Sequence, residues 1–255
     1  MTNNECVGSI FLLRMDGCIL LHPSASRHCL SRGHLWPRFF CYSYSLLVYT
    51  YDILCDMEII LSTRNPSKVV QISAVFQGLP VVIFSLDDAG ILGEGIEDGE
   101  TLEENSYKKA YFAWEQTRKW SMADDTGLYI DALGGEPGIK AARWAGEAAT
   151  TDEIRAYTLQ RLAHVPLEKR TATFKTVATL ISPTGEKYFF EGEVKGILLT
   201  EPCTIAQPKM PYSSLFVPHG YTKTWAEMTT EEENEISHRG QAFRKVREFV
   251  GIRCA

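Results

Sequence analysis

The hydrophobic and polar positions of the chain form two different patterns, which meet near Met57. Residues 1–56 show no clear helical or strand period and contain few acidic side chains. From Met57 onward, short apolar runs alternate with amphipathic segments. We therefore expect a globular domain over 57–255, preceded by an atypical extension over 1–56.

The extension contains one apolar run, "FFCYSYSLLVYTYDIL" at 39–54. This run is shorter than the roughly 20 residues of a membrane-spanning helix, and serine and tyrosine interrupt it. It also lies too far from the N-terminus for a signal peptide and has no obvious cleavage site. A transit peptide is one alternative. We favour a poorly ordered extension, or sequence upstream of a true start at Met57.

The pattern within 57–255 predicts alternating strands and helices. Apolar, β-branched runs predict strands at 57–63, 80–86, 121–125, 170–183 and 186–199. Helical spacing predicts helices at 68–79, 101–120, 150–165 and 230–251. Thr101 and Glu104 match a capping box at the start of the second helix. This order predicts an α/β fold with a mixed sheet.

Composition and charge narrow the function classes. The 255 residues are 45% hydrophobic and 23% charged, with a formal net charge of −6. This acidic balance argues against a nucleic-acid partner, and no segment indicates a membrane protein. Only Cys203 and Cys254 follow residue 56, which suits a reduced, cytoplasmic setting.

The stretch "STRNPSK" at 62–68 links a strand to a helix. Backbone amides at such a turn and the N-terminus of a helix favour anions. Thr63 and Asn65 can donate hydrogen bonds to a phosphate, and Lys68 can neutralise one. The glycines of a Walker A loop are absent. An ordinary Asn-Pro turn is the alternative.

An acidic loop and the helix after it contribute Glu97 and Lys109. Magnesium prefers oxygen ligands and often shares substrate phosphates, so Glu97 can hold a metal while Lys109 contacts a phosphate. A solvated acidic loop is the alternative.

The stretch "ADDTGLYIDALGGEPGIKAARWAG" at 123–146 places Asp124 and Asp125 at a predicted strand tip. Neighbouring side chains on a strand point to opposite faces, so we expect different roles for the two carboxylates. One can hold a metal or activate water while the other orients its neighbours. The glycines that follow allow tight turns close to a ligand.

The stretch "ISHRGQA" at 236–242 lies within the last predicted helix. His238 and Arg239 can donate hydrogen bonds to a carbonyl group on a base. A Ser-His-Arg triplet is otherwise unremarkable in a helix.

Taken in order, these motifs resemble the inosine triphosphate pyrophosphatases. The family pattern T-x-N-x-x-K resembles 63–68, its ADD block is matched almost without change by 123–146, and its SHRG-x-A ending is matched by 237–242. The resemblance covers residues 57 to about 250 and does not include 1–56.

The resemblance implies Mg²⁺-dependent hydrolysis of non-standard purine nucleoside triphosphates (ITP, dITP and XTP) to a monophosphate and pyrophosphate. It implies an elongated mixed β-sheet flanked by helices, a long central substrate cleft and a homodimer. Glu97 and Asp125 would hold the metal, and the catalytic set would be Asp125, Lys109 and Lys68, with Asp125 as the general base. Substrate-binding residues would be Thr63, Asn65, Lys68, Lys109, Asp124, Thr126, Gly127, Tyr212, Ser237, His238 and Arg239.

The chemistry of these residue types agrees with the resemblance. Attack at the α-phosphorus needs charge neutralisation and in-line positioning. A 6-oxo group accepts hydrogen bonds whereas the amino group of adenine donates them, so donors at His238 and Arg239 would reject adenine.

The chain departs from the family where the base should bind. The family pattern F-G-Y/W-D-P-x-F is replaced at 210–216 by "MPYSSLF", and Glu233 stands where the family usually has lysine. Three interpretations remain: an active pyrophosphatase with weaker or altered base selection, which we favour; the same activity with the base held by Tyr212 and aromatics such as Trp225; or a nucleotide-binding protein without turnover. A pyrophosphatase that also cleaves ATP and GTP is a further rival.

Overall fold

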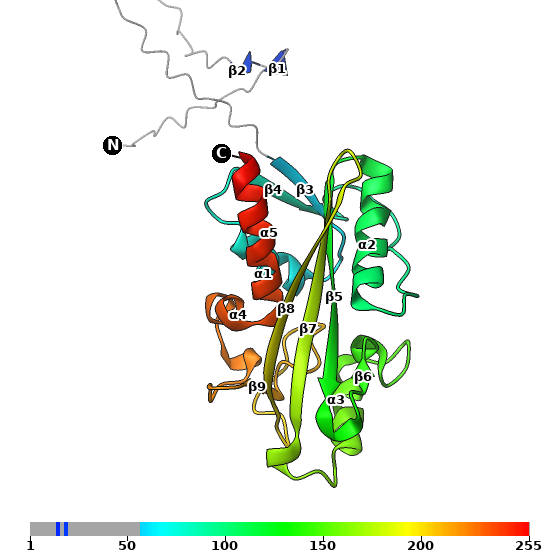
Figure 1. Ribbon diagram of the computed structural model, residues 1–255, viewed down its shortest axis with the longest axis vertical. Helices are drawn as coiled ribbons and strands as arrows, with labels where there is room; N and C mark the ends of the chain where they lie inside the picture. Colours follow the sequence, from blue (N-terminus) through cyan, green and yellow to red (C-terminus); the bar gives the residue numbers. More distant parts are fainter. Residues whose placement is uncertain (1–13, 16–17, 20–56, 255) are drawn as a thin grey trace, which may run out of the picture. The chain divides into compact units, whose positions relative to one another are not determined.

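The computed structural model describes residues 14–15, 18–19 and 57–254 (Figure 1). Two short strands, β1 (Arg14–Met15) and β2 (Cys18–Ile19), pair antiparallel. The interpretations of the rest of 1–56 lie outside the described residues.

These elements are built on one mixed sheet. Its strands are β3 (Met57–Leu61), β4 (Val81–Ser85), β5 (Trp120–Ile130), β6 (Pro137–Gly138), β7 (Thr171–Ile181), β8 (Lys187–Leu198) and β9 (Phe216–Pro218). The order is β4-β3-β5-β7-β8-β9, with β6 paired to β5. β3 runs parallel to β4 and β5, and the other pairs are antiparallel. The predicted α/β fold with a mixed sheet is confirmed.

Helices cover both faces of the sheet (Figure 1). They are α1 (Pro66–Val75), α2 (Leu102–Thr117), α3 (Thr151–Arg161), α4 (Thr230–Ile236) and α5 (His238–Cys254). Met122 of β5 packs with α1 and α5, whereas the next residue, Ala123, packs with α2. Because side chains alternate along a strand, α1 and α5 lie on one face of β5 and α2 lies on the other.

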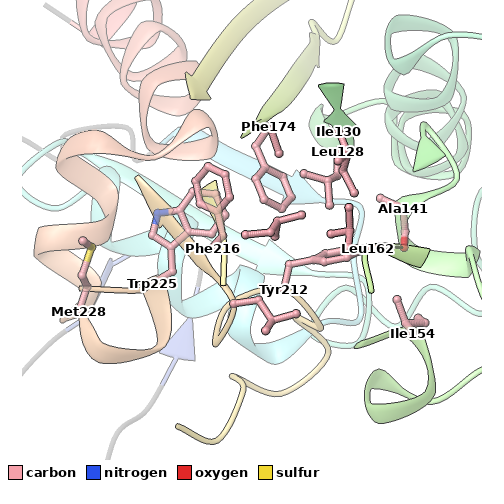
Figure 2. Close-up of a cluster of buried hydrophobic side chains, with 13 residues drawn as sticks. Leu128, Ile130, Ala141, Ile154, Leu162, Phe174, Tyr212, Phe216, Trp225 and Met228 are labelled. Atoms are coloured by element: carbon pink, nitrogen blue, oxygen red, sulfur yellow. Dashed lines mark hydrogen bonds between the residues drawn. The ribbon is translucent and has the colours of Figure 1, made fainter. Parts of the chain in front are cut away.

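An aromatic cluster fills the core near β9 (Figure 2). The ring of Phe174 lies 4.9 Å from Phe216 and 4.8 Å from Trp225, centroid to centroid. Tyr212 packs on the same ring at 5.8 Å. Large aromatic side chains contribute much of the apolar area that a core buries. The cluster therefore fixes the loop around Tyr212 against the sheet.

Two predictions about element boundaries are wrong. Asp124 and Asp125 do not lie at a strand tip, because β5 continues to Ile130 and pairs with β7 through Ala172. The glycine-rich sequence after Asp125 suggested turns, but buried Leu128 and Ile130 on one face of β5 keep the strand in the sheet.

The predicted helix over 230–251 is divided into α4 and α5. Ser237 has an extended backbone, and its hydroxyl accepts a hydrogen bond from the Gly240 amide at 3.0 Å. A serine that accepts such a bond is typical of a helix N-cap. His238 and Arg239 therefore lie in the first turn of α5 rather than inside a longer helix.

Helix caps account for other boundaries. The Thr101 hydroxyl caps α2 by accepting from the Glu104 amide at 3.1 Å, as predicted. The Glu104 carboxylate accepts from the Glu100 amide instead of closing the capping box on Thr101. Within the part of the chain that the structure describes, no helix has both the length and the apolar character of a membrane span.

Candidate active site

Asp124 points to the face of β5 that α1 and α5 cover. Lys68 of α1 donates to both of its carboxylate oxygens at 3.0 Å, and Arg239 Nε of α5 donates to Oδ2 at 3.2 Å. The residue is only 3% exposed. Burial by itself would raise the pKa of Asp124, but Lys68 and Arg239 outweigh it and hold the pKa well below its usual range. Asp124 is thus an anionic anchor for two cations.

Asp125 points to the opposite face, toward α2. Its Oδ1 accepts from Lys109 at 2.9 Å, and its Oδ2 accepts from the Asn105 amide at 3.2 Å. Burial raises the pKa of Asp125, and this effect exceeds the opposing attraction of Lys109. The predicted difference in role between the two adjacent carboxylates therefore has a structural basis, with Asp125 the more basic of the pair.

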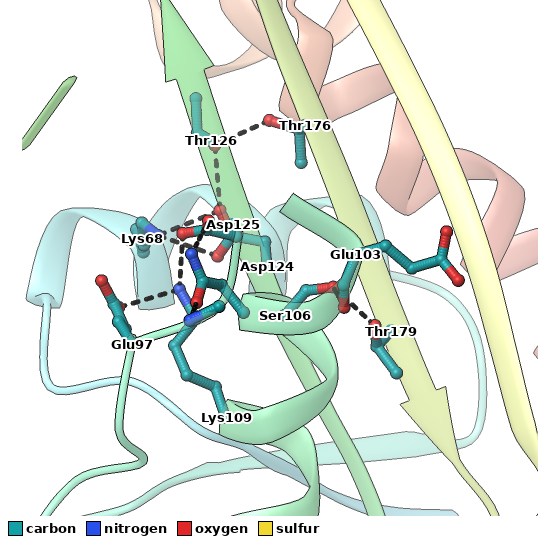
Figure 3. A network of polar contacts seen from close by, with 12 residues as sticks. Lys68, Glu97, Glu103, Ser106, Lys109, Asp124, Asp125, Thr126, Thr176 and Thr179 are labelled. Atoms are coloured by element: carbon teal, nitrogen blue, oxygen red, sulfur yellow. Dashed lines mark hydrogen bonds and ion pairs between the residues drawn. The ribbon is translucent and has the colours of Figure 1, made fainter. Parts of the chain in front are cut away.

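Lys109 joins Asp125 to Glu97 (Figure 3). Its ammonium group lies 3.0 Å from Glu97 Oε1 and 2.9 Å from Asp125 Oδ1. Burial alone would lower the pKa of Lys109, but these two carboxylates raise it. Arg143 holds Glu97 from the other side, through a contact of 3.4 Å to Oε2 and a hydrogen bond of 3.1 Å to the carbonyl oxygen. The two acids thus face a single cation.

The "STRNPSK" turn forms a second wall. Asn65 caps α1 by accepting from the Ser67 amide at 3.1 Å, and the Thr63 hydroxyl accepts from the Asn65 amide at 3.2 Å. Arg64 pairs with Asp87 and donates to the carbonyl oxygen of Ile91 at 2.6 Å. These contacts fix the turn at the N-terminus of α1, where a helix favours anions.

Two cavities meet at these residues. The first, which we call the polar cavity, has a volume of about 410 Å³ and includes Thr63, Arg64, Asn65, Lys68, Glu97, Lys109 and Asp124 in its lining. The second, the aromatic cavity, has a volume of about 150 Å³ and includes Asp125, Thr126, Phe174, Tyr212, Trp225, Glu233, His238 and Arg239. Lys68, Glu97, Lys109, Ala142, Lys209 and Pro211 line both. The cavities therefore form one cleft with a charged end and an aromatic end.

His238 lies at the aromatic end. Its ring stacks on Phe174 at 4.9 Å and an interplanar angle of 19°, and it lies 4.9 Å from the Trp225 ring. Burial lowers the pKa of His238 well below its ordinary value, and Arg239 adds to the effect. The imidazole is therefore neutral at physiological pH and can donate one hydrogen bond and accept another.

This burial predicts a pH-dependent stability. In the unfolded chain, His238 binds a proton below about pH 6.5, whereas in the folded chain the buried imidazole stays neutral. The free energy of unfolding should therefore fall as the pH decreases below that value, with a slope of up to about 1.4 kcal/mol per pH unit from this group. Urea unfolding should be measured from pH 8 to 5. The fall in the free energy of unfolding should be smaller in His238→Phe than in wild type. It should be unchanged in His164→Asn, because His164 is exposed. Parallel curves for wild type and His238→Phe would contradict the prediction.

The structure gathers most of the sequence-predicted site residues at this cleft. Lining residues from that set are Thr63, Asn65, Lys68, Glu97, Lys109, Asp124, Asp125, Thr126, Tyr212, His238 and Arg239. Gly127 and Ser237 line neither cavity. Gly127 lies where a β-carbon would approach the Gly138 carbonyl oxygen at 3.1 Å, and Ser237 caps α5. Direct substrate binding by these two residues stays a prediction.

Other polar residues at the site had no predicted role. Arg64 and Lys209 line the cleft, and Arg143 and Asn105 hold Glu97 and Asp125. Arg64 and Arg143 lie within the motifs at 62–68 and 123–146, and this position in the sequence was the only indication that they belong to the site. Lys209 precedes the divergent loop, and no pattern in the sequence connects it to the other cations.

The divergent loop packs against the sheet. Tyr212 is buried, and its hydroxyl donates to the Ala141 carbonyl oxygen at 2.8 Å. Met210 and Pro211 line the aromatic cavity beside it. Tyr212 is thus part of the wall that Trp225 and Phe174 complete, and contact of these aromatics with the base stays a prediction.

Comparison with known proteins identifies the family to which this α/β protein belongs. A sequence model of the Ham1 family matches residues 59–249. The chain belongs to this family.

Two similar curated proteins carry the same name. A protein from Geobacter sulfurreducens named dITP/XTP pyrophosphatase is 39% identical over 194 residues, which cover 76% of this chain and 96% of the relative. A protein of the same name from Thermoanaerobacter sp. is 40% identical over the same proportions. The family model, which matches residues 59–249, spans the residues that line both ends of the cleft.

Solved structures agree with the fold. A Ham1 protein from Coxiella burnetii is 30% identical, with a TM-score of 0.67 over 76% of this chain and 98% of that one. A dITP/XTP pyrophosphatase from Mycobacterium abscessus is 35% identical, with a TM-score of 0.59 over 74% and 98%. The mixed sheet flanked by helices is therefore shared with these proteins.

The oxygen donors where the two ends of the cleft meet suit a magnesium ion. Among the residues that the structure describes, no three or more His, Cys, Asp or Glu side chains gather as a metal site. Glu97 and Asp125 nevertheless both approach the Lys109 ammonium within 3.0 Å, so their oxygens face the same cationic position. Mg²⁺ commonly binds through one or two carboxylates, with water and substrate phosphates completing its shell. The pair therefore fits this ion.

Proposed function

We propose that this chain is a nucleoside triphosphate pyrophosphatase that hydrolyses ITP, dITP and related 6-oxopurine nucleotides to a monophosphate and pyrophosphate. The observation that supports this most directly is the Asp125–Lys109–Glu97 arrangement, which lies where the charged and aromatic ends of the cleft meet. A nucleotide needs both ends, because it carries a polyanion and an aromatic base.

The charged end binds the triphosphate. Lys68, Lys109 and Lys209 line the cleft, and the Thr63–Asn65 turn adds hydrogen-bonding groups at the N-terminus of α1. Phosphoryl transfer depends mainly on neutralising charge and on positioning the attacking oxygen in line with the leaving group. Asp124 keeps Lys68 and Arg239 in place through its paired contacts.

Asp125 accepts the proton of the attacking water. Its pKa is raised by burial, so the carboxylate is a better base than an exposed aspartate. The water oxygen forms a bond to the α-phosphorus, its proton goes to Asp125, and the bond to the pyrophosphate oxygen breaks. Asn105, which donates to Oδ2, orients the carboxylate for this role.

Glu97 and Asp125 would hold Mg²⁺. When bound, the ion supplies charge neutralisation on the phosphate oxygens. Lys109 would then be available to contact the triphosphate, because its two carboxylate partners would be engaged by the metal.

The aromatic end binds the base. Phe174 and Trp225 line this end with aromatic rings, and His238 and Arg239 provide donors. Nε and Nη1 of Arg239 already donate to Asp124 and to Gln71. The other N–H groups of Arg239 and the N–H of His238 require an acceptor, which a 6-oxo group supplies. The amino group of adenine would leave these donors unpaired.

The rival functions make different predictions. A binding protein would retain nucleotide without releasing pyrophosphate, and a broader pyrophosphatase would cleave ATP as readily as ITP. A homodimer and a cytoplasmic location, which the sequence led us to expect, stay predictions that gel filtration and fractionation would test.

The products formed from ITP test the proposed bond cleavage. With Mg²⁺, ³¹P NMR should show IMP and pyrophosphate in equal amounts, because attack at the α-phosphorus separates these two groups. Omission of Mg²⁺ should suppress both. Formation of IDP and inorganic phosphate would contradict cleavage between the α- and β-phosphates.

A further inference from the structure

One acidic side chain lies at the otherwise aromatic and cationic end of the cleft. Glu233 of α4 lines the aromatic cavity together with Trp225, His238 and Arg239. It is only 4% exposed. A buried carboxylate is costly unless it is hydrogen-bonded, so its surroundings determine what it can do.

Gln207 holds this carboxylate in place. The Gln207 side-chain amide donates to Glu233 Oε2 at 3.1 Å and to the Trp225 carbonyl oxygen at 3.4 Å. The backbone amide of Gln207 in turn donates to the Ser213 hydroxyl at 2.8 Å, and that hydroxyl donates to the Met210 carbonyl oxygen at 2.9 Å. Two departures from the family pattern, Ser213 and Glu233, are thus connected through one glutamine.

Polar atoms near Glu233 lack partners. Within the described residues, His238 Nδ1, Trp225 Nε1 and Gln207 Oε1 are buried without a hydrogen bond. Nearly all buried polar atoms in folded proteins are paired. Since His238 and Trp225 line the aromatic cavity, a planar ligand with polar edges would supply what they lack.

We infer that Glu233 makes this site prefer a 2-amino-6-oxopurine, the guanine type of base, over a 2,6-dioxopurine such as xanthine. The inference rests on the proposed function and specifies its substrate class. Burial raises the pKa of Glu233, while the hydrogen bond from Gln207 and the charge of Arg239 oppose this and favour the ionised form. In that form the carboxylate only accepts hydrogen bonds and has about four lone-pair sites. Gln207 uses one of its oxygens, which leaves acceptor capacity for the base.

The edges of the purines explain this preference. With the 6-oxo group at the donors His238 and Arg239, the neighbouring N1–H and the 2-amino group of guanine both donate. A carboxylate can accept from both, and hydrogen bonds to charged groups are the stronger kind. Xanthine instead presents an oxygen at C2, which a carboxylate repels. Hypoxanthine presents only hydrogen there, so its binding should depend less on Glu233.

The experiment compares kcat/KM for GTP, XTP and ITP in wild type, Glu233→Gln and Glu235→Gln. Glu235 is exposed on the same helix and serves as the matched control. Wild type should favour GTP over XTP by about tenfold or more. Glu233→Gln should lower this ratio by about tenfold, since a neutral amide both donates and accepts. Glu235→Gln should leave the ratio unchanged.

The result that would overturn the inference is a wild type that cleaves XTP as well as GTP, or a GTP-to-XTP ratio that Glu233→Gln does not change. The ratio is measured within one variant, so a general loss of folding does not obscure it. Turnover of ITP by wild type keeps the proposed function intact in either case. If no nucleotide is cleaved, the proposed function fails, and the relative binding of GMP and XMP to wild type and Glu233→Gln decides the inference by itself.

Discussion

Asp125→Asn should lower the rate of pyrophosphate release from ITP by about a thousandfold or more. The amide keeps the shape of the side chain but accepts no proton from water, and general-base catalysis alone contributes about 10²–10⁴-fold. It also removes one of the two carboxylates that would hold Mg²⁺. The rate should be measured under saturating ITP, with Asp152→Asn as the control, because Asp152 is exposed in the first turn of α3.

Folding should be little affected by Asp125→Asn. Lys109 keeps its contact of 3.0 Å with Glu97 when the Asp125 charge is removed. A variant that unfolds at the same urea concentration as wild type and releases no pyrophosphate would therefore identify a catalytic loss. Turnover within tenfold of wild type would show that another group activates the water.

Asp124→Asn should mainly destabilise the protein, by about 3–5 kcal/mol in the free energy of unfolding. Asp124 pairs with both Lys68 and Arg239 while only 3% exposed. Removing its charge leaves the Arg239 guanidinium buried without its carboxylate partner. Urea denaturation measures the effect directly.

The contrast between the two aspartates is the informative result. Surface substitutions such as Asp152→Asn should stay within about 0.5 kcal/mol of wild type. If Asp124→Asn also stayed in that range, the paired contacts on the α1 and α5 face would not anchor these cations. Activity should fall as well, because Lys68 and Arg239 both line the cleft.

Local signals in the sequence predicted the fold class and most of the site. The Asn-Pro turn and the Thr101 cap depend on short-range hydrogen bonds, and both form as neighbouring residue types suggest. The alternation along a strand likewise predicted that Asp124 and Asp125 would have different surroundings. Lys68 meets Asp124 and Lys109 meets Asp125 on opposite faces of β5.

Features that depend on tertiary contacts were not predictable. The continuation of β5 past Gly127 requires pairing with β7, which lies about fifty positions further along the chain. Arg143 meets Glu97 only after β6 turns back along β5. The break at Ser237 had a local signal, a serine that can cap a helix, but the continuous helical pattern concealed it.

The close approach of α5 to the sheet is a further tertiary feature. A β-carbon at Gly192 of β8 would collide with the carbonyl oxygen of His238, so the absence of a side chain there lets the first turn of α5 lie directly on the strand. The sequence pattern showed only a glycine within a strand. The position of His238 and Arg239 at the cleft depends on this contact.

The most direct test of the proposed activity is kcat/KM for pyrophosphate release from ITP compared with ATP, with Mg²⁺ present. Donors at His238 and Arg239 should favour the 6-oxo base by about a hundredfold or more, because a 6-amino group leaves them unpaired in a buried site. Rapid release from ITP with little from ATP is the predicted result. Equal rates for the two nucleotides, or no release from either, would contradict the account.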